Sequence, residues 1–182
     1  VTTTIIDNDT DPTIQHVTVE ARVSEEGLIA GISDSIGENV GDDTTDVTTV
    51  TGSMIFNDED GDTLTVALSA PTVSLTSNGH VITWAGDGTG HLIGSANGSE
   101  VITVDLDSTG GYVVSLVGSV DHPNNSVEDI LSFDLGVAVT DGQATATATL
   151  TVTVEDDMPT TSDISHDLTI PVQNTNLMII LD

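Results

Sequence analysis

The densest run of potential metal ligands in this chain is Asp58-Glu59-Asp60-Gly61-Asp62. Aspartate occupies alternate positions in this run, and Gly61 permits a tight turn. Carboxylate oxygens are the donors that hard cations prefer, and Ca²⁺ takes about six to eight oxygens. An EF-hand is excluded, because the twelfth position counted from Asp58 is Ser69 and not glutamate. The run therefore predicts either a cation-binding loop of another kind or a solvated acidic turn.

The charge balance of the chain favours a bound cation. Its 182 residues include 30 Asp and Glu but a single Lys or Arg, Arg22, which gives a formal net charge of −29. Ion pairs cannot offset this excess, and like charges destabilise a compact state. A divalent cation is the simplest counter-charge, and the oxygen ligands favour Ca²⁺. Cysteine is absent, so an exported domain of this sequence needs a stiffener other than disulfides.

The same composition excludes several classes of function. Binding to nucleic acid or to an anionic membrane surface requires Lys and Arg, which are nearly absent. No apolar run approaches the roughly 18 residues of a transmembrane helix, so we expect no direct membrane insertion. We also expect no enzyme, because the sequence has no Gly-x-Ser-x-Gly elbow and no zinc-like spacing of histidines. The histidines are expected in turns or at the surface: His16, His80, His91, His122 and His166.

β-Strands are the elements that must position the acidic residues. Residues 131–139 and 144–154 alternate apolar and polar side chains with period two, which is typical of half-buried strands. Asp141-Gly142 between them predicts a two-residue hairpin turn. Further strand pairs are expected at 72–76 with 81–84 and at 101–106 with 112–117, and strands at 48–56 and 64–68 are expected to flank the acidic turn at 57–62. No segment has a helical period, so the pattern predicts an all-β sandwich.

Loop positions predict that the acidic residues gather at two poles. Successive loops of a sandwich alternate between its ends, so the N-terminal junction, the loop at 58–62 and the turn at Asp141 share one end. The carboxylates expected there as metal ligands are Asp7, Asp9, Asp58, Asp60, Asp62 and Asp141. The opposite end is expected to hold the loop at 42–46. The ligands expected at that end are Glu25, Glu155, Asp156 and Asp157.

A short internal repeat marks the two ends of one unit. Residues 3–9, Thr-Thr-Ile-Ile-Asp-Asn-Asp, lead to Pro12, and residues 151–157, Thr-Val-Thr-Val-Glu-Asp-Asp, lead to Pro159. Each copy is a strand followed by an acidic linker and a proline, as expected of a tandem array. We therefore assign 1–12 to the last strand and linker of a preceding repeat and 13–159 to the sandwich. Residues 160–182 are assigned to a linker and the truncated start of a following domain.

Several motifs resemble one family in their order and spacing. They are Val23-Ser24-Glu25-Glu26-Gly27-Leu28, residues 48–52 and 58–64, Ile82-Thr83-Trp84 before residues 86–90, Gly110-Gly111-Tyr112, Asp121-His122-Pro123, and residues 131–157. Residues 23–159 thereby resemble the tandem repeat of giant RTX adhesins, which bacteria export by type I secretion. The resemblance implies an immunoglobulin-like or cadherin-like β-sandwich with calcium at the junctions between repeats. It also implies a monomer at the bacterial cell surface, whose partners are neighbouring repeats of the same polypeptide.

The tail departs from this repeat. Asn176-Leu177-Met178-Ile179-Ile180-Leu181-Asp182 is similar to the first strand of a von Willebrand A domain. That strand ends in the first aspartate of a metal-dependent adhesion site, a position that Asp182 would occupy. An ordinary core strand is the other interpretation of the same residues.

Two functions of different class fit the sequence. The first is a calcium-rigidified extender of a large surface adhesin, which projects a binding tip for cell adhesion or biofilm formation. The alternative is a calcium-dependent carbohydrate- or ligand-binding sandwich, which needs aromatic platforms or a calcium open to sugar hydroxyls. The aromatic residues all fall in strand patterns and are expected in the core: Phe56, Trp84, Tyr112 and Phe133. This placement favours the extender.

Overall fold

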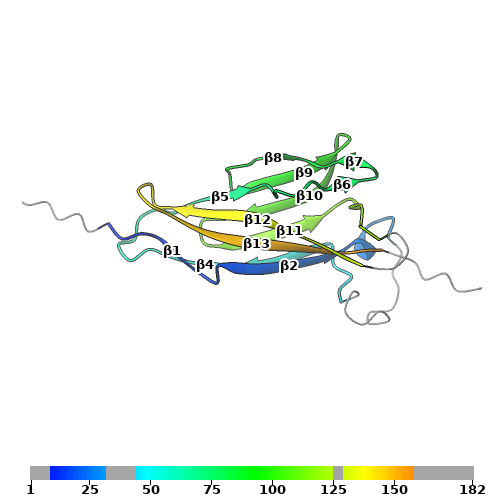
Figure 1. Cartoon of the computed structure of the whole chain (residues 1–182). Helices are drawn as coiled ribbons and strands as arrows, with labels where there is room; N and C mark the ends of the chain where they lie inside the picture. The colour runs from blue at the N-terminus through cyan, green and yellow to red at the C-terminus, as the bar shows by residue number, and fades with distance from the viewer. Residues whose placement is uncertain (1–8, 32–43, 125–128, 158–182) are drawn as a thin grey trace, which may run out of the picture.

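Two β-sheets face each other across an apolar core, and their strands follow the long axis of the molecule (Figure 1). The computed structural model describes residues 9–31, 44–124 and 129–157. One sheet has the strand order β3-β11-β10-β9-β8, and the other has the order β2-β13-β12-β5. Within the described residues the helical content is one 3₁₀ turn, η1 (Glu25–Gly27). The fold is therefore the all-β sandwich of immunoglobulin or cadherin type that was expected.

The strands fall into two main sheets and two short ladders. The first sheet contains β3 (Thr49–Ser53), β11 (Gly111–Leu116), β10 (Ser99–Leu106), β9 (His91–Ala96) and β8 (Thr83–Ala85). The second contains β2 (Thr18–Ser24), β13 (Thr145–Glu155), β12 (Ile130–Thr140) and β5 (Thr65–Ser69). The short ladders pair β1 (Thr13–Gln15) with β4 (Ile55–Asn57), and β6 (Thr76–Ser77) with β7 (His80–Val81).

The core follows from the period-two pattern of the strands. Alternate residues of β12 and β13 are buried, and the opposite first sheet contributes its own buried side chains, such as Val104 and Val114. Phe133 and Tyr112 are buried, while Phe56 and Trp84 pack against the core from its edge. The described residues include every aromatic side chain of the chain, and none of these is exposed. The predicted core placement of the aromatic residues is confirmed.

The three predicted hairpins are confirmed, with differences in length. The strands that flank the acidic loop, β4 and β5, pair with β1 and β12 and not with each other. β12 and β13 pair from Ile130↔Glu155 to Thr140↔Thr145, so their connection is the four residues 141–144 and not a two-residue turn. Asn78-Gly79 does connect two strands, but β6 and β7 pair at only two positions. The hairpin of β9 with β10 was not predicted, because Gly94 interrupts the apolar pattern of β9. Asn97-Gly98, with both residues at positive φ, was the available signal for its turn.

The first strand of the domain is divided between two partners. β1 pairs antiparallel with β4, whereas β2 pairs in parallel with β13 over Thr18↔Thr149 to Ser24↔Glu155. His16, with φ of 60°, lies at the break between β1 and β2. This left-handed backbone lets the chain leave one ladder and join the other sheet. The domain thus places its first and last strands side by side.

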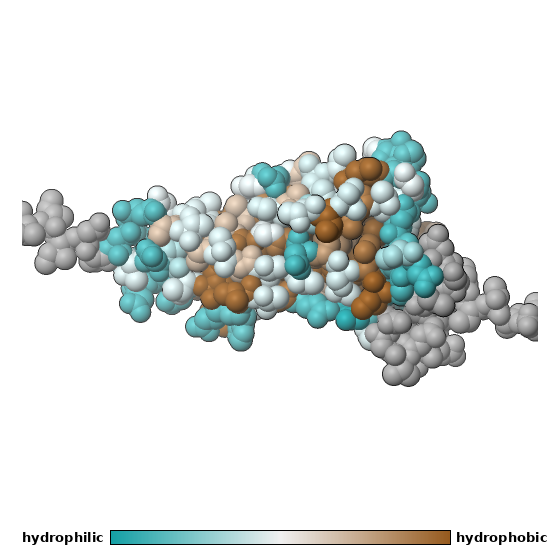
Figure 2. Space-filling model, viewed as in Figure 1, coloured by the Kyte–Doolittle hydropathy of each residue, from teal (hydrophilic) through white to brown (hydrophobic). Residues whose placement is uncertain are grey.

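The acidic loops lie at opposite ends of the molecule. β1 and the β12–β13 turn lie at one end, and the ends of β2 and β13 lie at the other (Figure 1). Hydrophilic residues gather at both ends in the space-filling view (Figure 2). We call the end with Asp9, residues 58–62 and residues 141–144 the N-terminal pole. We call the end with Glu25, His122, Asp129, Asp156 and Asp157 the C-terminal pole. The predictions for residues 1–8, including Asp7, and for Asp42, His166 and the tail 160–182 lie outside the described residues.

Candidate metal sites

Three segments from distant parts of the sequence meet at the N-terminal pole. They are the residues before β1, the β4–β5 loop and the β12–β13 turn. The carboxylates of Asp9, Asp60 and Asp62 each offer an oxygen, and these oxygens lie within 4.8 Å of one another. The backbone N–H of Thr10 donates to Oδ2 of Asp60 at 2.7 Å, which ties the first segment to the second. The prediction that Asp9, Asp60 and Asp62 lie at the same end of the domain is therefore confirmed.

Asp58 holds the β4–β5 loop in its turn. Its Oδ1 accepts the backbone N–H groups of Asp60 at 3.2 Å, Gly61 at 3.0 Å and Asp62 at 3.4 Å. Gly61 has φ of 83°, a conformation that favours glycine. The other oxygen, Oδ2, is shielded from solvent and has no hydrogen-bond partner. A shielded anionic oxygen without a partner is unfavourable, so Oδ2 is a candidate to contact a cation.

The proximity of Asp58 and Asp60 also perturbs their titration. Contact with the Asp60 carboxyl, followed by the backbone N–H donors, lowers the pKa of Asp58. The same contact raises the pKa of Asp60, chiefly because its carboxylate lies against that of Asp58. Two ionised carboxylates this close repel each other, and a proton on one of them relieves the repulsion. A divalent cation supplies the same compensation without a proton, so metal and proton compete for this pair.

Asp141 repeats this use of its two oxygens in the β12–β13 turn. Its Oδ1 accepts the N–H groups of Gln143 and Ala144, both at 2.7 Å. Its Oδ2 is shielded and has no hydrogen-bond partner, as in Asp58. The side chain of Gln143 donates from Nε2 to Oδ1 of Asp9 at 2.7 Å, which connects this turn to the residues before β1. All the residues that were predicted as ligands of this pole, and that the structure describes, therefore lie at the same end of the domain.

A second group of titratable side chains forms the C-terminal pole. The ligand atoms of His122, Asp129 and Asp156 lie within 4.8 Å of one another. Nδ1 of His122 lies 2.7 Å from Oδ1 of Asp129, and Nε2 lies 3.6 Å from Oε1 of Glu25. Glu25 is buried in η1 and accepts the N–H of Val120 at 2.6 Å. Burial raises the pKa of Asp156.

His122 corrects the expectation that every histidine lies in a turn or at the surface. Its side chain is only 2% exposed. Burial by itself would lower its pKa, but the carboxylates of Glu25, Asp156 and Asp129 outweigh burial and raise it. The sequence analysis missed this residue as a candidate ligand, because no nearby His or Cys forms a familiar ligand spacing with it. Asp129, seven positions later, was the one local signal.

Of the residues predicted as ligands for the C-terminal pole, Glu155 has a different role. Its side chain is 1% exposed and accepts from Nη1 of Arg22 at 3.0 Å. It also accepts from the backbone N–H groups of Thr44 and Thr45 and from the Thr44 hydroxyl. These donors compensate its charge, so Glu155 is the buried partner of the chain's single arginine. Glu25 and Asp156 do belong to the pole.

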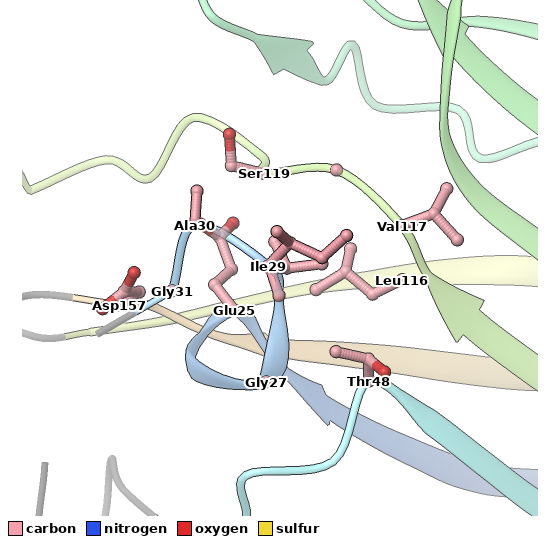
Figure 3. Close-up of a pocket in the computed structure, with 12 residues that line it drawn as sticks. Glu25, Gly27, Ile29, Ala30, Gly31, Thr48, Leu116, Val117, Ser119 and Asp157 are labelled. Atoms are coloured by element: carbon pink, nitrogen blue, oxygen red, sulfur yellow. The ribbon is translucent and has the colours of Figure 1, made fainter. Parts of the chain in front are cut away.

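Two adjoining pockets open at the C-terminal pole. Glu25, Ser119 and Asp157 line both of them. The first continues over apolar side chains that include Ile29 and Leu116 (Figure 3). The second is polar and includes His122 and Asp156. Asp157 itself donates its N–H to Oδ1 of Asp156 at 2.9 Å.

Comparison with known proteins gives distant structural likeness only. No family model matches the chain, and no curated protein matches it. It is similar to a crystal structure of Drosophila N-cadherin EC1-3, at 16% identity and a TM-score of 0.40, with 82% of this chain and 35% of that one covered. It is also similar to human protocadherin-24 EC1-2, at 15% identity and a TM-score of 0.34, with 81% and 44% covered. The chain thus spans less than half the length of either structure. Across the described residues, no helix has the length and apolar character needed to cross a membrane.

Proposed function

We propose that this chain is a calcium-rigidified extender module of a large bacterial surface adhesin of the RTX type. One observation carries the proposal. Asp9, which precedes the first strand, lies with Asp60 and Asp62 of the β4–β5 loop so that their oxygens are within 4.8 Å. A cation at this place joins the chain that enters the domain to the body of the domain. Such a site acts on the orientation of the module relative to what precedes it.

The chemistry of the site fits Ca²⁺. The candidate donors are carboxylate oxygens, including the partnerless Oδ2 atoms of Asp58 and Asp141. Ca²⁺ accepts such oxygen ligands in flexible geometry, and extracellular modules bind it at roughly 10⁻⁴ to 10⁻³ M. Without the cation, the like charges repel and the entering segment is held mainly by hydrogen bonds such as Thr10–Asp60. With Ca²⁺ bound, each carboxylate is attracted to the shared cation, and the junction stiffens.

The shape of the domain suits a spacer. The two poles lie at opposite ends of the long axis (Figure 1). β12 and β13 each have 11 residues and, at about 3.3 Å per residue, extend about 35 Å along that axis. Modules of this form add length when they are joined end to end. We propose that the module is exported by type I secretion, acts at the cell surface and supports adhesion through a distal tip.

The carbohydrate-binding alternative lacks a platform in this fold. Sugars stack on exposed aromatic faces, whereas Phe133 and Tyr112 are buried and Phe56 and Trp84 pack against the core. A glycan array tests this point directly. Reproducible, calcium-dependent sugar binding would favour the alternative.

The decisive experiment measures thermal unfolding of the full chain in chelator and in millimolar Ca²⁺. Ligand that binds only the folded state raises stability with the logarithm of its concentration over Kd. We expect a calcium-dependent rise in Tm for the parent and loss of that rise in the Asp60→Asn/Asp62→Asn variant. Asp134→Asn is the matched control, because Asp134 is an exposed carboxylate on β12 that accepts a hydrogen bond from the Thr151 hydroxyl and belongs to neither pole. No calcium effect on the parent would sink the proposal.

A further inference from the structure

The C-terminal pole differs chemically from the N-terminal pole. Its cluster includes a histidine nitrogen, whereas the N-terminal cluster consists of carboxylates. We propose that the C-terminal pole is a second metal site, in which Nε2 of His122 and the carboxylates of Glu25 and Asp156 bind a borderline transition metal such as Zn²⁺ in preference to Ca²⁺. This inference does not depend on calcium at the N-terminal pole, because the two sites share no residue.

The first support is an imidazole nitrogen without a hydrogen bond. The His122 side chain is only 2% exposed, and its Nε2 is shielded from solvent with no hydrogen-bond partner. The nearest carboxylate oxygen, Oε1 of Glu25, lies at 3.6 Å, which is too long for a hydrogen bond. Buried polar nitrogens in native proteins nearly always have a partner. A metal ion between His122 and Glu25 would provide one.

The second support is the arrangement around the other ring nitrogen. Nδ1 of His122 lies 2.7 Å from Oδ1 of Asp129, so Asp129 fixes the ring and favours the tautomer whose proton is on Nδ1. The lone pair of that tautomer is on Nε2. Metal-binding histidines almost always donate their second ring N–H to a carboxylate, carbonyl or water in this way. Asp129 is therefore a positioning residue in this proposal.

The third support is the placement of the carboxylates. His122, Asp156 and Glu25 line the same polar pocket. Oε1 of Glu25 lies 3.6 Å from Nε2 of His122, and Asp156 offers an oxygen within 4.8 Å of a His122 ring nitrogen. Oε1 of Glu25 is held by the N–H of Val120 at 2.6 Å, and Asp156 is placed by the end of β13. One nitrogen and two carboxylate oxygens leave a fourth position for water in the tetrahedral geometry that Zn²⁺ favours. Ca²⁺ prefers oxygen ligands throughout, whereas imidazole suits zinc and related metals.

A metal here would connect three parts of the chain. Glu25 follows β2, His122 lies in the segment after β11, and Asp156 follows β13. The ion would therefore fix the point at which the last strand leaves the sandwich. The two poles would then respond to different metals, which separates control of the entering chain from control of the leaving chain.

The test uses the full chain in saturating Ca²⁺, titrated with Zn²⁺ by calorimetry and with Co²⁺ by visible absorption. We expect one tight equivalent of Zn²⁺ and a Co²⁺ band typical of nitrogen and oxygen ligands. His122→Gln should weaken Zn²⁺ binding at least tenfold, as expected for a lost ligand, and Asp129→Asn by about 10- to 100-fold. His91→Gln is the matched control, because Nδ1 of His91 also contacts an aspartate, Asp105 at 2.5 Å, but both side chains are more than half exposed. It should leave binding unchanged.

A second measurement keeps the proposal testable if His122→Gln does not fold. In the ¹⁵N-labelled parent, Zn²⁺ should shift the Nε2 resonance of His122 and leave Nδ1 protonated. Three results would overturn the proposal. They are Zn²⁺ binding unchanged in His122→Gln, displacement of Zn²⁺ by Ca²⁺ at matched concentration, and a His122 ring that stays doubly protonated in the presence of Zn²⁺. In the last case the imidazolium itself is the cation between the carboxylates.

Discussion

The backbone N–H of Thr10 donates a 2.7 Å hydrogen bond to Oδ2 of Asp60, which lies 50 positions further along the chain. This bond ties the entering segment to the β4–β5 loop without any metal. It also uses one oxygen of a carboxylate that lies against a second carboxylate, that of Asp58. The segment is therefore positioned in advance, while the charge of the site remains uncompensated. Replacing the Asp60 carboxylate should therefore have opposite effects on stability in the absence and in the presence of Ca²⁺.

Asp60→Asn should raise Tm in chelator and lower it in Ca²⁺. Contact with Asp58 raises the folded-state pKa of Asp60 above the ordinary aspartate value. Its contribution to stability is then present at low pH and lost as pH rises through the raised pKa. At pH 7 without metal, the ionised group is unfavourable and asparagine relieves it by a small margin. With Ca²⁺, the same change removes a ligand. Differential scanning calorimetry in both buffers checks this, and a Tm change of one sign throughout would contradict it.

Arg22→Met should destabilise the domain by about 2–3 kcal/mol, because it leaves the buried carboxylate of Glu155 without its cationic partner. The figure is below the range for fully buried pairs, since the Arg22 side chain is 30% exposed. Urea unfolding measures it. Glu20→Gln is the control, since Glu20 is the exposed second partner of Arg22, and it should cost less than about 1 kcal/mol. Equal effects of the two variants would contradict the assignment.

Gly52→Ala should destabilise the domain by about 1–3 kcal/mol through overpacking. Gly52 pairs with Tyr112 across β3 and β11, and an added Cβ would lie 2.2 Å from the Tyr112 Oη and 2.3 Å from its ring carbon Cζ. Gly136→Ala in β12 is the matched strand control. Its added Cβ would lie 3.2 Å from Cβ and 3.6 Å from Oγ of Ser69, a far milder contact than at Gly52, so we expect a smaller change, of about 1 kcal/mol or less. Chemical unfolding measures the loss of stability in both variants. A larger loss for Gly52→Ala would show that the contact with Tyr112 matters more than the general effect of alanine in a strand.

Asp107→Asn should lower stability at pH 7 and have little effect in strong acid. The Thr109 hydroxyl and N–H, and the N–H groups of Gly111 and Gly110, lower the pKa of Asp107 below 3.8. A depressed carboxylate pKa gives stability that is present above the unfolded-state value and lost as pH falls through the folded-state value. Thermal unfolding of parent and variant over a series of acidic buffers should therefore show their Tm values converging as the pH falls through the folded-state pKa of Asp107.

Much of the sandwich followed from the sequence because local rules determine it. The alternation of residues 131–139 and 144–154 placed Phe133 and Leu150 inward, and it required no knowledge of partners. Loop positions likewise brought Asp9, Asp60 and Asp62 to one end. The first deduction uses only the two-residue period of a strand. The second uses only the rule that successive loops alternate between the two ends of a sandwich.

The remainder depended on contacts between distant residues. Glu155 was expected to bind metal, but Arg22, which lies 133 positions away, neutralises it. The parallel pairing of β2 with β13 creates that contact, and no local pattern encodes it. His122 was missed for the same reason, since Glu25 and Asp156, which lie beside it in space, come from opposite ends of the domain's sequence. The one available hint was that Arg22, as the single Lys or Arg of the chain, would be expected to pair with a buried carboxylate.

The parallel ladder between β2 and β13 has a mechanical consequence. The chain enters β2 from the N-terminal side and leaves β13 at the C-terminal pole, so tension along the axis pulls these neighbours in opposite directions. The load then acts in shear on the whole ladder from Thr18↔Thr149 to Ser24↔Glu155, and its hydrogen bonds must fail together. Peeling, by contrast, would break them one at a time. The Arg22–Glu155 ion pair joins the same two strands and so resists the same slip.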